Sequence, residues 1–210
     1  MIKIPLHAIS RLRPGTDGKG VRTLVVVRGC TLRCQYCLNP LSWAEGRVPK
    51  RMSPEELYRT VKIDDIYFRA NNGGITFGGG EPALYADFIV DFVNKYCNRW
   101  HVDMQTALNV PYRNIERLIP VIDHFWIDIK SWNPETYEKY TGLDNRQVVA
   151  NMNILKERCP GKVTVKIPLI PGFNDEDEQL KTARIMETFG FKVKMFQYTL
   201  DVNDIGGKQL

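Results

Sequence analysis

Long apolar runs are absent from this 210-residue sequence, which excludes a helix that spans a membrane. The first residues contain no apolar signal core, and no low-complexity tract or internal repeat follows them. Cysteine is scarce, with five residues. An odd number of cysteines without a signal peptide argues against a disulfide scaffold. We therefore expect a cytoplasmic protein whose thiols are reduced.

The composition is that of a folded globular protein, with 43% hydrophobic and 25% charged residues. This balance excludes an intrinsically disordered chain and a collagen-like one. The length predicts a single domain over residues 1–210. Within it we expect an N-terminal extension over 1–22, a core over about 23–200 and a tail over 201–210.

Positive charge is concentrated at the front of the chain. The net charge is +5, and the first 60 residues hold 11 basic and 4 acidic residues. A basic front can attract an acidic electron carrier, a phosphate or nucleic acid, and it can equally be a solvated face. No motif that combines aromatic and basic residues for base stacking accompanies it. We therefore expect no nucleic-acid partner.

Strand-like runs alternate with helical patterns along the chain. Helices are predicted from Ser53 onwards, over 83–96, within 110–118, over 134–158 with a break near Gly142, and over 175–189. Strands are predicted over 24–27, 74–77, 100–106, 124–129, 163–169 and 193–197. Such alternation indicates βαβ units and a parallel sheet. A closed barrel needs about 250 residues. We therefore predict an α/β fold with an open, partial (β/α)6 barrel, and a flat doubly wound sheet is the alternative.

Residues that could bind a metal or a cofactor follow the carboxyl ends of the predicted strands. In a parallel barrel these ends meet at one mouth, where active sites form. In chain order the residues are Cys30, Cys34 and Cys37; Gly78, Gly79, Gly80 and Glu81; Gln105 and Thr106; Asp128 and Lys130; Lys166; and Tyr198. We expect them to surround a single site.

The three crowded cysteines, Cys30, Cys34 and Cys37, have the spacing Cys-x3-Cys-x2-Cys. Thiolates at such spacing suit an iron–sulfur cluster or zinc. A structural zinc site is normally closed by a fourth ligand, and no further Cys or His lies nearby in the sequence. We expect a cluster that leaves one iron open, and a zinc- or cluster-bearing binding module without enzymatic activity is the alternative. Cys97 and Cys159 are interpreted as bystanders.

The segment from Cys30 to Cys37, with Tyr36 before the last cysteine, resembles the signature of the radical S-adenosylmethionine (SAM) superfamily. The resemblance implies a [4Fe-4S] cluster held by the three cysteines, with SAM on the fourth iron. One electron from the reduced cluster would cleave SAM to methionine and a 5′-deoxyadenosyl radical, which abstracts hydrogen. On the same resemblance, Tyr36 and Thr106 are counted among the cofactor-binding residues.

The segment Gly78-Gly79-Gly80-Glu81 resembles the glycine-rich motif of that superfamily. The resemblance implies that this segment contacts the SAM amino group. Glycine allows a backbone to approach a ligand without a clash from Cβ. A plain turn between strand and helix is the alternative interpretation.

From about residue 15 to 200 the chain is similar to the glycyl-radical-enzyme activating enzymes. The likeness rests on Asp17 to Arg22, on Asp128-Ile129-Lys130 and on Lys166 to Asp175. It implies that Lys130 pairs with the SAM carboxylate and that Asp128 helps to build a monovalent cation site. It places Lys166 near the SAM methionine or the substrate. A surface salt bridge is the alternative for Asp128 and Lys130.

Three positions depart from the pattern of these activating enzymes. Gln105 stands where many of them carry a carboxylate, which removes one anionic ligand from the implied cation site. Leu38 replaces a common histidine, and Thr199 stands where some members have histidine. These changes bear on the substrate more than on the chemistry.

The resemblance implies an activase that abstracts hydrogen from a glycine of a partner glycyl radical enzyme. It also implies a flavodoxin or ferredoxin as the electron donor, and the basic front, with Arg28 and Arg33 beside the cysteines, would suit such an acidic carrier. Radical SAM modification of another peptide, a nucleotide or a small molecule is the alternative.

Overall fold

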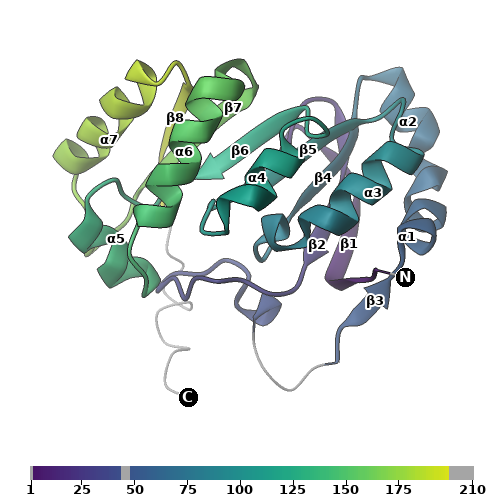
Figure 1. The fold of residues 1–210 in the computed structure, drawn as a ribbon, viewed down its shortest axis with the longest axis horizontal. Helices are drawn as coiled ribbons and strands as arrows, with labels where there is room; N and C mark the ends of the chain where they lie inside the picture. The colour runs from purple at the N-terminus through teal and green to yellow at the C-terminus, as the bar shows by residue number, and fades with distance from the viewer. Residues whose placement is uncertain (1, 44–47, 199–210) are drawn as a thin grey trace.

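The computed structural model of the chain describes residues 2–43 and 48–198. These residues form one eight-stranded sheet (Figure 1). The strands are β1 (Ile4–Pro14), β2 (Val21–Val27), β3 (Lys50–Met52), β4 (Gly74–Gly79), β5 (His101–Thr106), β6 (His124–Asp128), β7 (Val163–Leu169) and β8 (Lys192–Gln197). The helices are α1 (Pro54–Val61), α2 (Asp65–Ala70), α3 (Ala86–Tyr96), α4 (Tyr112–Leu118), α5 (Pro134–Thr141), α6 (Arg146–Arg158) and α7 (Glu176–Thr188).

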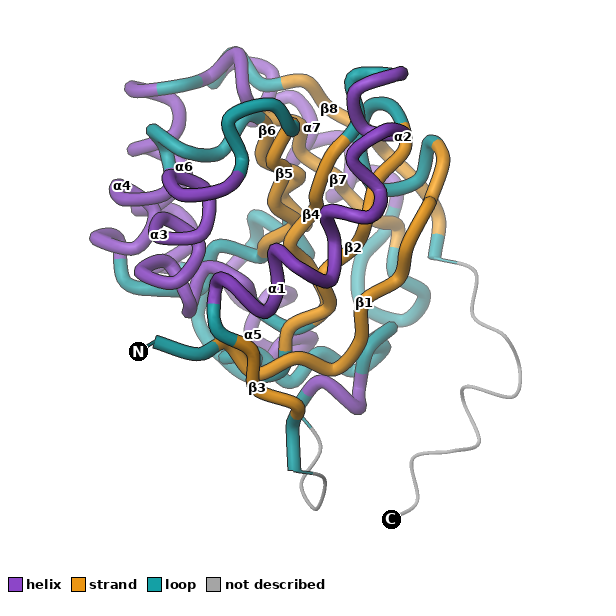
Figure 2. Tube along the Cα trace, turned by 90° about the vertical axis from the view of Figure 1, so that its right-hand side faces the viewer, coloured by secondary structure: helices purple, strands orange, loops and turns teal. Residues whose placement is uncertain are grey.

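The strand order is β3-β1-β2-β4-β5-β6-β7-β8. From β2 to β8 every neighbouring pair is parallel, while β1 runs antiparallel to both β2 and β3. Among the described residues the outer strands β3 and β8 do not pair with each other, so the sheet stays open. The prediction of an open, partial (β/α)6 barrel is confirmed. Helices α3, α4 and α6 lie against one face of the sheet (Figures 1 and 2).

Strands β1 and β3 were not predicted. Strand β1 lies within the segment that was expected to be an N-terminal extension, yet it pairs with β2 along most of its length. Only its first three residues are buried, and the rest of the strand is exposed or half-buried. Strand β3 covers only the first residues of β1. Because β1 carries neither a continuous apolar run nor a clean alternation, periodicity did not reveal it.

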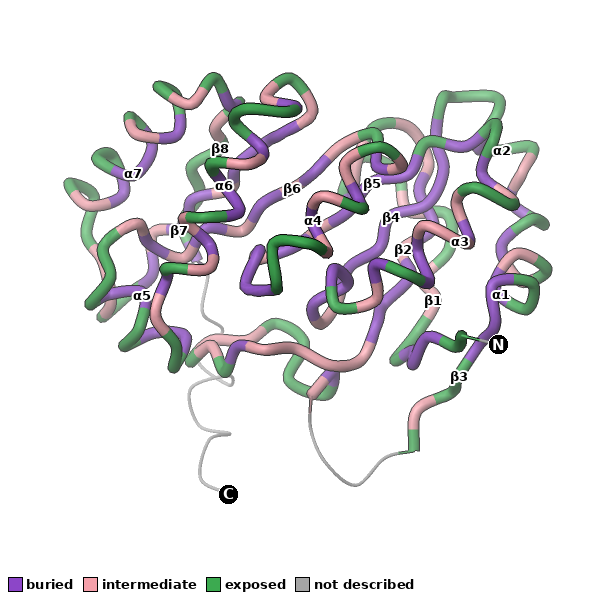
Figure 3. The backbone as a smooth tube through the Cα atoms, in the orientation of Figure 1, coloured by how far each residue is buried: buried purple, intermediate pink, exposed green. Residues whose placement is uncertain are grey.

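The main core fills the space between the sheet and the helices. Val25, Val27 and Phe77 are fully buried, and Figure 3 colours much of β2 and β4 as buried. The ring of Phe77 meets that of Phe92 on α3 edge-on, with 5.9 Å between centroids. Burial of this apolar surface stabilises the sheet and fixes where its strand ends lie. No helix among the described residues is both long and apolar enough to cross a membrane.

Local sequence signals set the helix boundaries. Ser53 caps α1, because its side chain accepts a hydrogen bond from the Glu56 backbone while the Glu56 carboxylate accepts one from the Ser53 backbone. Helix α5 ends at Gly142, which adopts a left-handed φ of 83°. The predicted break near Gly142 therefore separates α5 from α6.

The opposite, concave face carries buried charge near the amino-terminal ends of the parallel strands. Arg22 of β2 is fully buried and pairs with Asp103 of β5 at 3.1 Å. The loop between β1 and β2 lies against this pair, and its Asp17 accepts a hydrogen bond from Gln105 at 3.1 Å. The hairpin therefore covers the amino-terminal end of the barrel, and the site has to form at the other end.

Candidate functional site

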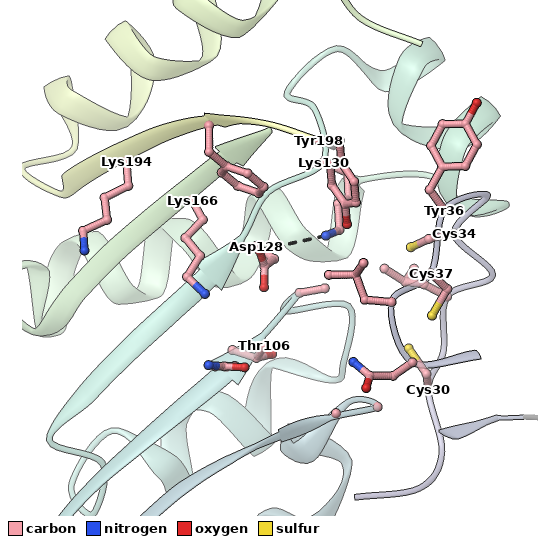
Figure 4. A pocket seen from close by; sticks show the side chains of 18 of the residues that line it. Cys30, Cys34, Tyr36, Cys37, Thr106, Asp128, Lys130, Lys166, Lys194 and Tyr198 are labelled. Carbon is pink, nitrogen blue, oxygen red and sulfur yellow. Dashed lines mark ion pairs between the residues drawn. The ribbon is translucent and has the colours of Figure 1, made fainter. Parts of the chain in front are cut away.

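A cavity of about 510 Å³ opens at the carboxyl ends of the parallel strands (Figure 4). Its walls come from the loop after β2 and from the ends of β4 to β8. The sequence-predicted residues that line it are Cys30, Cys34, Tyr36, Cys37, Gly79, Gly80, Gln105, Thr106, Asp128, Lys130, Lys166 and Tyr198. Gly78 and Glu81 are not part of the lining. Residues that lie far apart in the chain thus share one mouth.

The cysteine loop follows β2 directly and is fixed by its backbone. The Arg33 N–H donates to the Thr141 carbonyl at 2.9 Å, and the Gln35 N–H donates to the Tyr140 carbonyl at 3.0 Å. Leu32, between the first two cysteines, is buried in the core. The loop therefore rests on the carboxyl end of α5, which holds the three thiols at the cavity wall.

The donor set suits a cluster better than a single ion. All three thiols are free and half-buried. Among the described residues, no group of three His, Cys, Asp or Glu side chains converges closely enough to hold one metal ion. A cubane spreads its thiolates over separate irons and needs no such convergence. The residues present therefore fit a three-cysteine cluster.

Burial raises the pKa of two thiols in the cysteine loop. Burial raises the pKa of Cys30 to about 12, helped by the nearby Glu81 charge, and burial likewise raises that of Cys34. Metal coordination deprotonates a thiol outright. Cluster binding is therefore coupled to the loss of protons from these cysteines.

Trp43 is a contact of the cysteine loop that sequence reasoning missed. Its indole Nε1–H donates to Cys37 Sγ at 3.4 Å. The guanidinium of Arg33 lies 4.9 Å from the centroid of the same indole ring and donates to the Cys30 carbonyl at 2.8 Å. A donor and a cation beside a cluster ligand favour additional negative charge there. Only proximity to the cysteine motif could have drawn attention to this tryptophan.

The glycine-rich segment packs directly on the chain that leads into the cysteine loop. The Gly80 N–H donates to the Val27 carbonyl at 3.1 Å, and the Glu81 N–H donates to the Gly29 carbonyl at 2.7 Å. A Cβ at Gly80 would collide with that same Gly29 carbonyl. The absence of a side chain at Gly80 therefore lets the two strand ends approach each other.

Glu81 lies beneath the cavity, with 1% of its surface exposed. Its carboxylate accepts hydrogen bonds from the Thr106 hydroxyl at 2.6 Å and from the Ala107 N–H at 2.9 Å. Burial raises the pKa of Glu81 to about 7, although these donors act to lower it. Glu81 thus joins the end of β4 to the end of β5 and orients Thr106. Direct contact of Gly78 or Glu81 with SAM stays a prediction.

Asp128 and Lys130 face the cavity from the end of β6. Lys130 Nζ lies 4.0 Å from Asp128 Oδ1 (dashed in Figure 4) and 5.9 Å from the ring centroid of Tyr198. Burial acts to lower the pKa of Lys130, but the charge of Asp128 raises it above the ordinary value. Lys130 is therefore a half-buried cation at neutral pH, as a partner for a carboxylate requires.

Gln105 lines the cavity but is already engaged. Its amide Nε2–H donates to Asp17, which ties the hairpin of β1 and β2 to β5. Asp128 is the one acidic side chain in the described lining. The monovalent cation implied beside Asp128 stays a prediction.

An aromatic cluster holds the far side of the cysteine loop. The ring of Tyr36 meets those of Tyr140 and Phe173 edge-on, with centroid distances of 6.1 and 5.6 Å. The Tyr140 hydroxyl also donates to the Tyr36 carbonyl at 3.3 Å. Tyr36 therefore anchors the loop to α5 and to the segment after β7. Its edge at the cavity is compatible with cofactor contact, which stays a prediction.

The end of β8 contributes Lys194, Met195 and Phe196 to the lining, and none of these was predicted as a site residue. Leu38 is exposed at the rim. Cys97 and Cys159 are buried away from the cavity, in agreement with their interpretation as bystanders. Thr199 and the predicted tail over 201–210 lie outside the described residues.

Known proteins are similar in sequence to this chain over most of its length. Residues 24–182 match the model of the Radical SAM superfamily. The chain is 33% identical over 217 residues to the pyruvate formate-lyase-activating enzyme of Clostridium pasteurianum, covering 97% of this chain and 86% of that protein. It is 27% identical over 229 residues to the indoleacetate decarboxylase activating enzyme of Tractidigestivibacter scatoligenes, covering 78% and 73%.

Solved structures share the fold. SuiB from Streptococcus suis bound to S-adenosylmethionine superposes with a TM-score of 0.62 at 15% identity, covering 82% of this chain and 39% of SuiB. The chain thus spans about two fifths of the length of SuiB, and at this identity the likeness concerns the fold alone. Through the matched superfamily model and the activating-enzyme relatives, the chain belongs to the radical SAM superfamily and is an enzyme of its activating-enzyme group.

Proposed function

We propose that this enzyme activates a protein partner by abstracting hydrogen from one of its backbone glycines. The observation that carries the proposal is the arrangement at the cavity, where the cysteine loop faces Lys130 and the glycine-rich strand end across a single mouth. Superfamily membership implies a [4Fe-4S] cluster and SAM. The relatives named as activating enzymes support a protein substrate.

The bound cofactors would supply one electron that breaks the S–C5′ bond of SAM, giving methionine and a 5′-deoxyadenosyl radical that takes a hydrogen atom from glycine Cα. The chain itself binds and orients. Cys30, Cys34 and Cys37 would hold the cluster, and Lys130 would neutralise the SAM carboxylate. Gly79 and Gly80 would admit the SAM amino group beside a bare backbone.

The open side of the barrel supports a large substrate. Among the described residues the sheet ends at β8, and the cavity reaches this edge through Met195 and Phe196. Met195 is 50% exposed and Phe196 is 39% exposed. A peptide loop could therefore enter beside β8 and bring a glycine to the cofactors.

Further parts of the proposal concern the chain's surroundings. An acidic flavodoxin or ferredoxin would deliver the electron beside exposed Arg33, which lies next to two of the cysteines. A monovalent cation would sit at Asp128, whose side chain faces the cavity and is 29% exposed. We further propose one radical SAM domain over residues 1–210 and a cytoplasmic location, which suits reduced thiols.

The proposal is tested by anaerobic reconstitution followed by incubation with SAM, a reductant and a candidate glycyl radical enzyme. We expect about four iron and four sulfide per chain, reductive cleavage of SAM, and a glycyl radical signal by electron paramagnetic resonance. Cys34→Ala should abolish SAM cleavage, while Cys97→Ala, which removes a thiol outside the cavity, should retain it.

Each failure has a separate meaning. Stoichiometric zinc with no SAM binding would refute the radical chemistry and favour a metal-bearing binding module. SAM cleavage without a glycyl radical would refute the activase assignment alone and favour modification of another peptide, a nucleotide or a small molecule.

A further inference from the structure

Two lysines on neighbouring strands line the cavity. Lys166 of β7 and Lys194 of β8 are directly paired in the parallel register, so their side chains leave the sheet on the same face. Both line the cavity (Figure 4). Their ammonium groups lie 5.7 and 5.0 Å from the ring centroid of Trp126 on β6. We call Lys166, Lys194 and Trp126 the lysine wall.

The charge of the lysine wall is not neutralised within the part of the chain that the structure describes. Neither lysine forms an ion pair there, and Asp128, the acidic residue of the lining, pairs with Lys130. Like charges side by side on neighbouring strands repel each other. The indole face offsets part of this cost but brings no negative charge. The cavity therefore holds an excess of positive charge suited to an anionic guest.

The lysine wall lies on the side where a substrate would enter. Asp128 and Lys130 end β6, whereas Lys194 lies two strands further towards the open edge. The next residues of β8, Met195 and Phe196, continue the lining outwards with exposed apolar side chains. An anionic guest held by the two ammonium groups would lie near Trp126 of β6, on the strand that carries Asp128, and on the face that the open side of the barrel leaves accessible.

We propose that Lys166 and Lys194 bind the carboxylate of an acidic side chain that flanks the target glycine in the substrate peptide. The inference deepens the proposed function, on which it rests, by naming the class of peptide. Two ammonium groups match a single carboxylate, since lysine acts as a point charge without a fixed geometry. Phosphate sites typically add Arg or backbone N–H groups, and the lysine wall provides neither.

The test uses the reconstituted, SAM-loaded enzyme and alanine-based nonapeptides with a central glycine. One peptide carries Glu two residues from the glycine, a second carries Gln there and a third carries Lys. Fluorescence anisotropy of a neutral dye on each peptide reports its Kd. We expect the Glu peptide to bind about two- to fivefold more tightly than the Gln peptide, the range of one partly exposed ion pair. Added salt should narrow this difference.

Variants at Lys194 locate the effect. Lys194→Gln should erase the preference for the Glu peptide, and Lys194→Arg should restore it. Lys194→Glu should reverse the preference towards the Lys peptide, which a purely structural role would not produce. Lys192→Gln is the matched control, because Lys192 lies two residues earlier on the same strand but outside the cavity lining. It should leave the preference unchanged.

Equal affinity of the wild-type enzyme for the Glu and Gln peptides would overturn the inference, as would loss of the preference in Lys192→Gln. Displacement of the Glu peptide by free succinate at equal concentration would assign the lysine wall to a small carboxylate and overturn the peptide assignment. The proposed function has its own readout, the glycyl radical signal with a candidate partner. Its absence alongside a preserved Glu preference would refute the activase and not the carboxylate site.

Discussion

Trp126 separates two groups of charged side chains on the concave face of the sheet. Its indole N–H donates to Asp103 at 3.0 Å, and Asp103 pairs with fully buried Arg22. Its ring face meets the ammonium groups of Lys166 and Lys194, which have no carboxylate partner among the described residues. We call Arg22 and Asp103 the paired group and Lys166 and Lys194 the lysine group. The paired group is closed off within the fold, whereas the lysine group has no counter-ion among the described residues and lines the cavity.

The difference shows which charge serves the fold and which is available for binding. A buried charge without a counter-ion is costly, so Arg22 is tolerated because Asp103 and the Thr76 hydroxyl contact it. Half-buried Lys166 and exposed Lys194 keep access to water and need no internal partner. The same face therefore combines a structural ion pair with charges that can meet a ligand.

The largest effect on stability should come from breaking the ion pair of Arg22 and Asp103. Asp103→Ala leaves Arg22 buried and unpaired, and we expect a loss of about 3–5 kcal/mol in the free energy of unfolding, measured with urea. Asp91→Ala removes the partner of Lys95 in an exposed pair of 2.7 Å, and it should cost less than about 1 kcal/mol. Similar losses for the two variants would contradict the distinction between structural and available charge.

Glu81 is a buried acid that hydrogen bonds hold without a cation. Because its folded pKa of about 7 lies above the ordinary value of 4.5, the folded chain binds more protons between these values. This residue's contribution to stability should therefore fall as pH rises from about 4.5 to about 7, by roughly 3 kcal/mol. Urea unfolding of the cluster-free chain at several pH values should show this slope, and Glu81→Gln should remove it. A slope that survives in Glu81→Gln would have to come from another group.

The contact from Trp43 to Cys37 should affect the cluster more than the fold. Trp43→Phe keeps an aromatic ring beside Arg33 but removes the N–H donor to Sγ. The reduction potential of the reconstituted cluster should become more negative by roughly 40 mV, which corresponds to about 1 kcal/mol for one electron. A redox titration followed by electron paramagnetic resonance measures this shift. Trp132→Phe, whose ring packs on Phe189 outside the cavity, should leave the potential unchanged.

The smallest effect on stability should come from removing the charge of Lys194. Lys194→Gln removes a charge that no described carboxylate balances. We expect a change of less than about 0.5 kcal/mol in the free energy of unfolding. A loss as large as that of Asp103→Ala would show that Lys194 stabilises the fold, and it would remove the contrast on which the lysine wall rests.

Parts of the fold could be predicted from the sequence because β2, β4 and β7 are largely buried on both faces. Strand β2, with Val25 to Val27, gives a short apolar run of this kind, and Ser53 and Gly142 mark helix boundaries. Strands β1 and β3 were missed because they are antiparallel, largely exposed or half-buried, and without such runs. Their pairing depends on neighbours that are distant in the sequence.

The residues of the candidate site also divide into those that the sequence revealed and those that only the structure revealed. The cysteine spacing and the glycine-rich segment are local patterns, so they could be recognised directly. The positions of Glu81 and Trp43 were not accessible, because one depends on packing beneath β5 and the other on how the cysteine loop folds back. Lys194 looked like any lysine of a polar strand until the register of β7 and β8 placed it beside Lys166.

The sequence by itself determined the alternation of strands and helices, the three thiols and the order in which polar residues follow the strand ends. These features are encoded in spacing and periodicity over a few neighbouring residues. Only the tertiary structure decided which charges are neutralised, because an ion pair such as Arg22 with Asp103 joins residues 81 positions apart. The curvature of the sheet brought Trp126 between the two groups, and that placement separates charge that stabilises from charge that can bind.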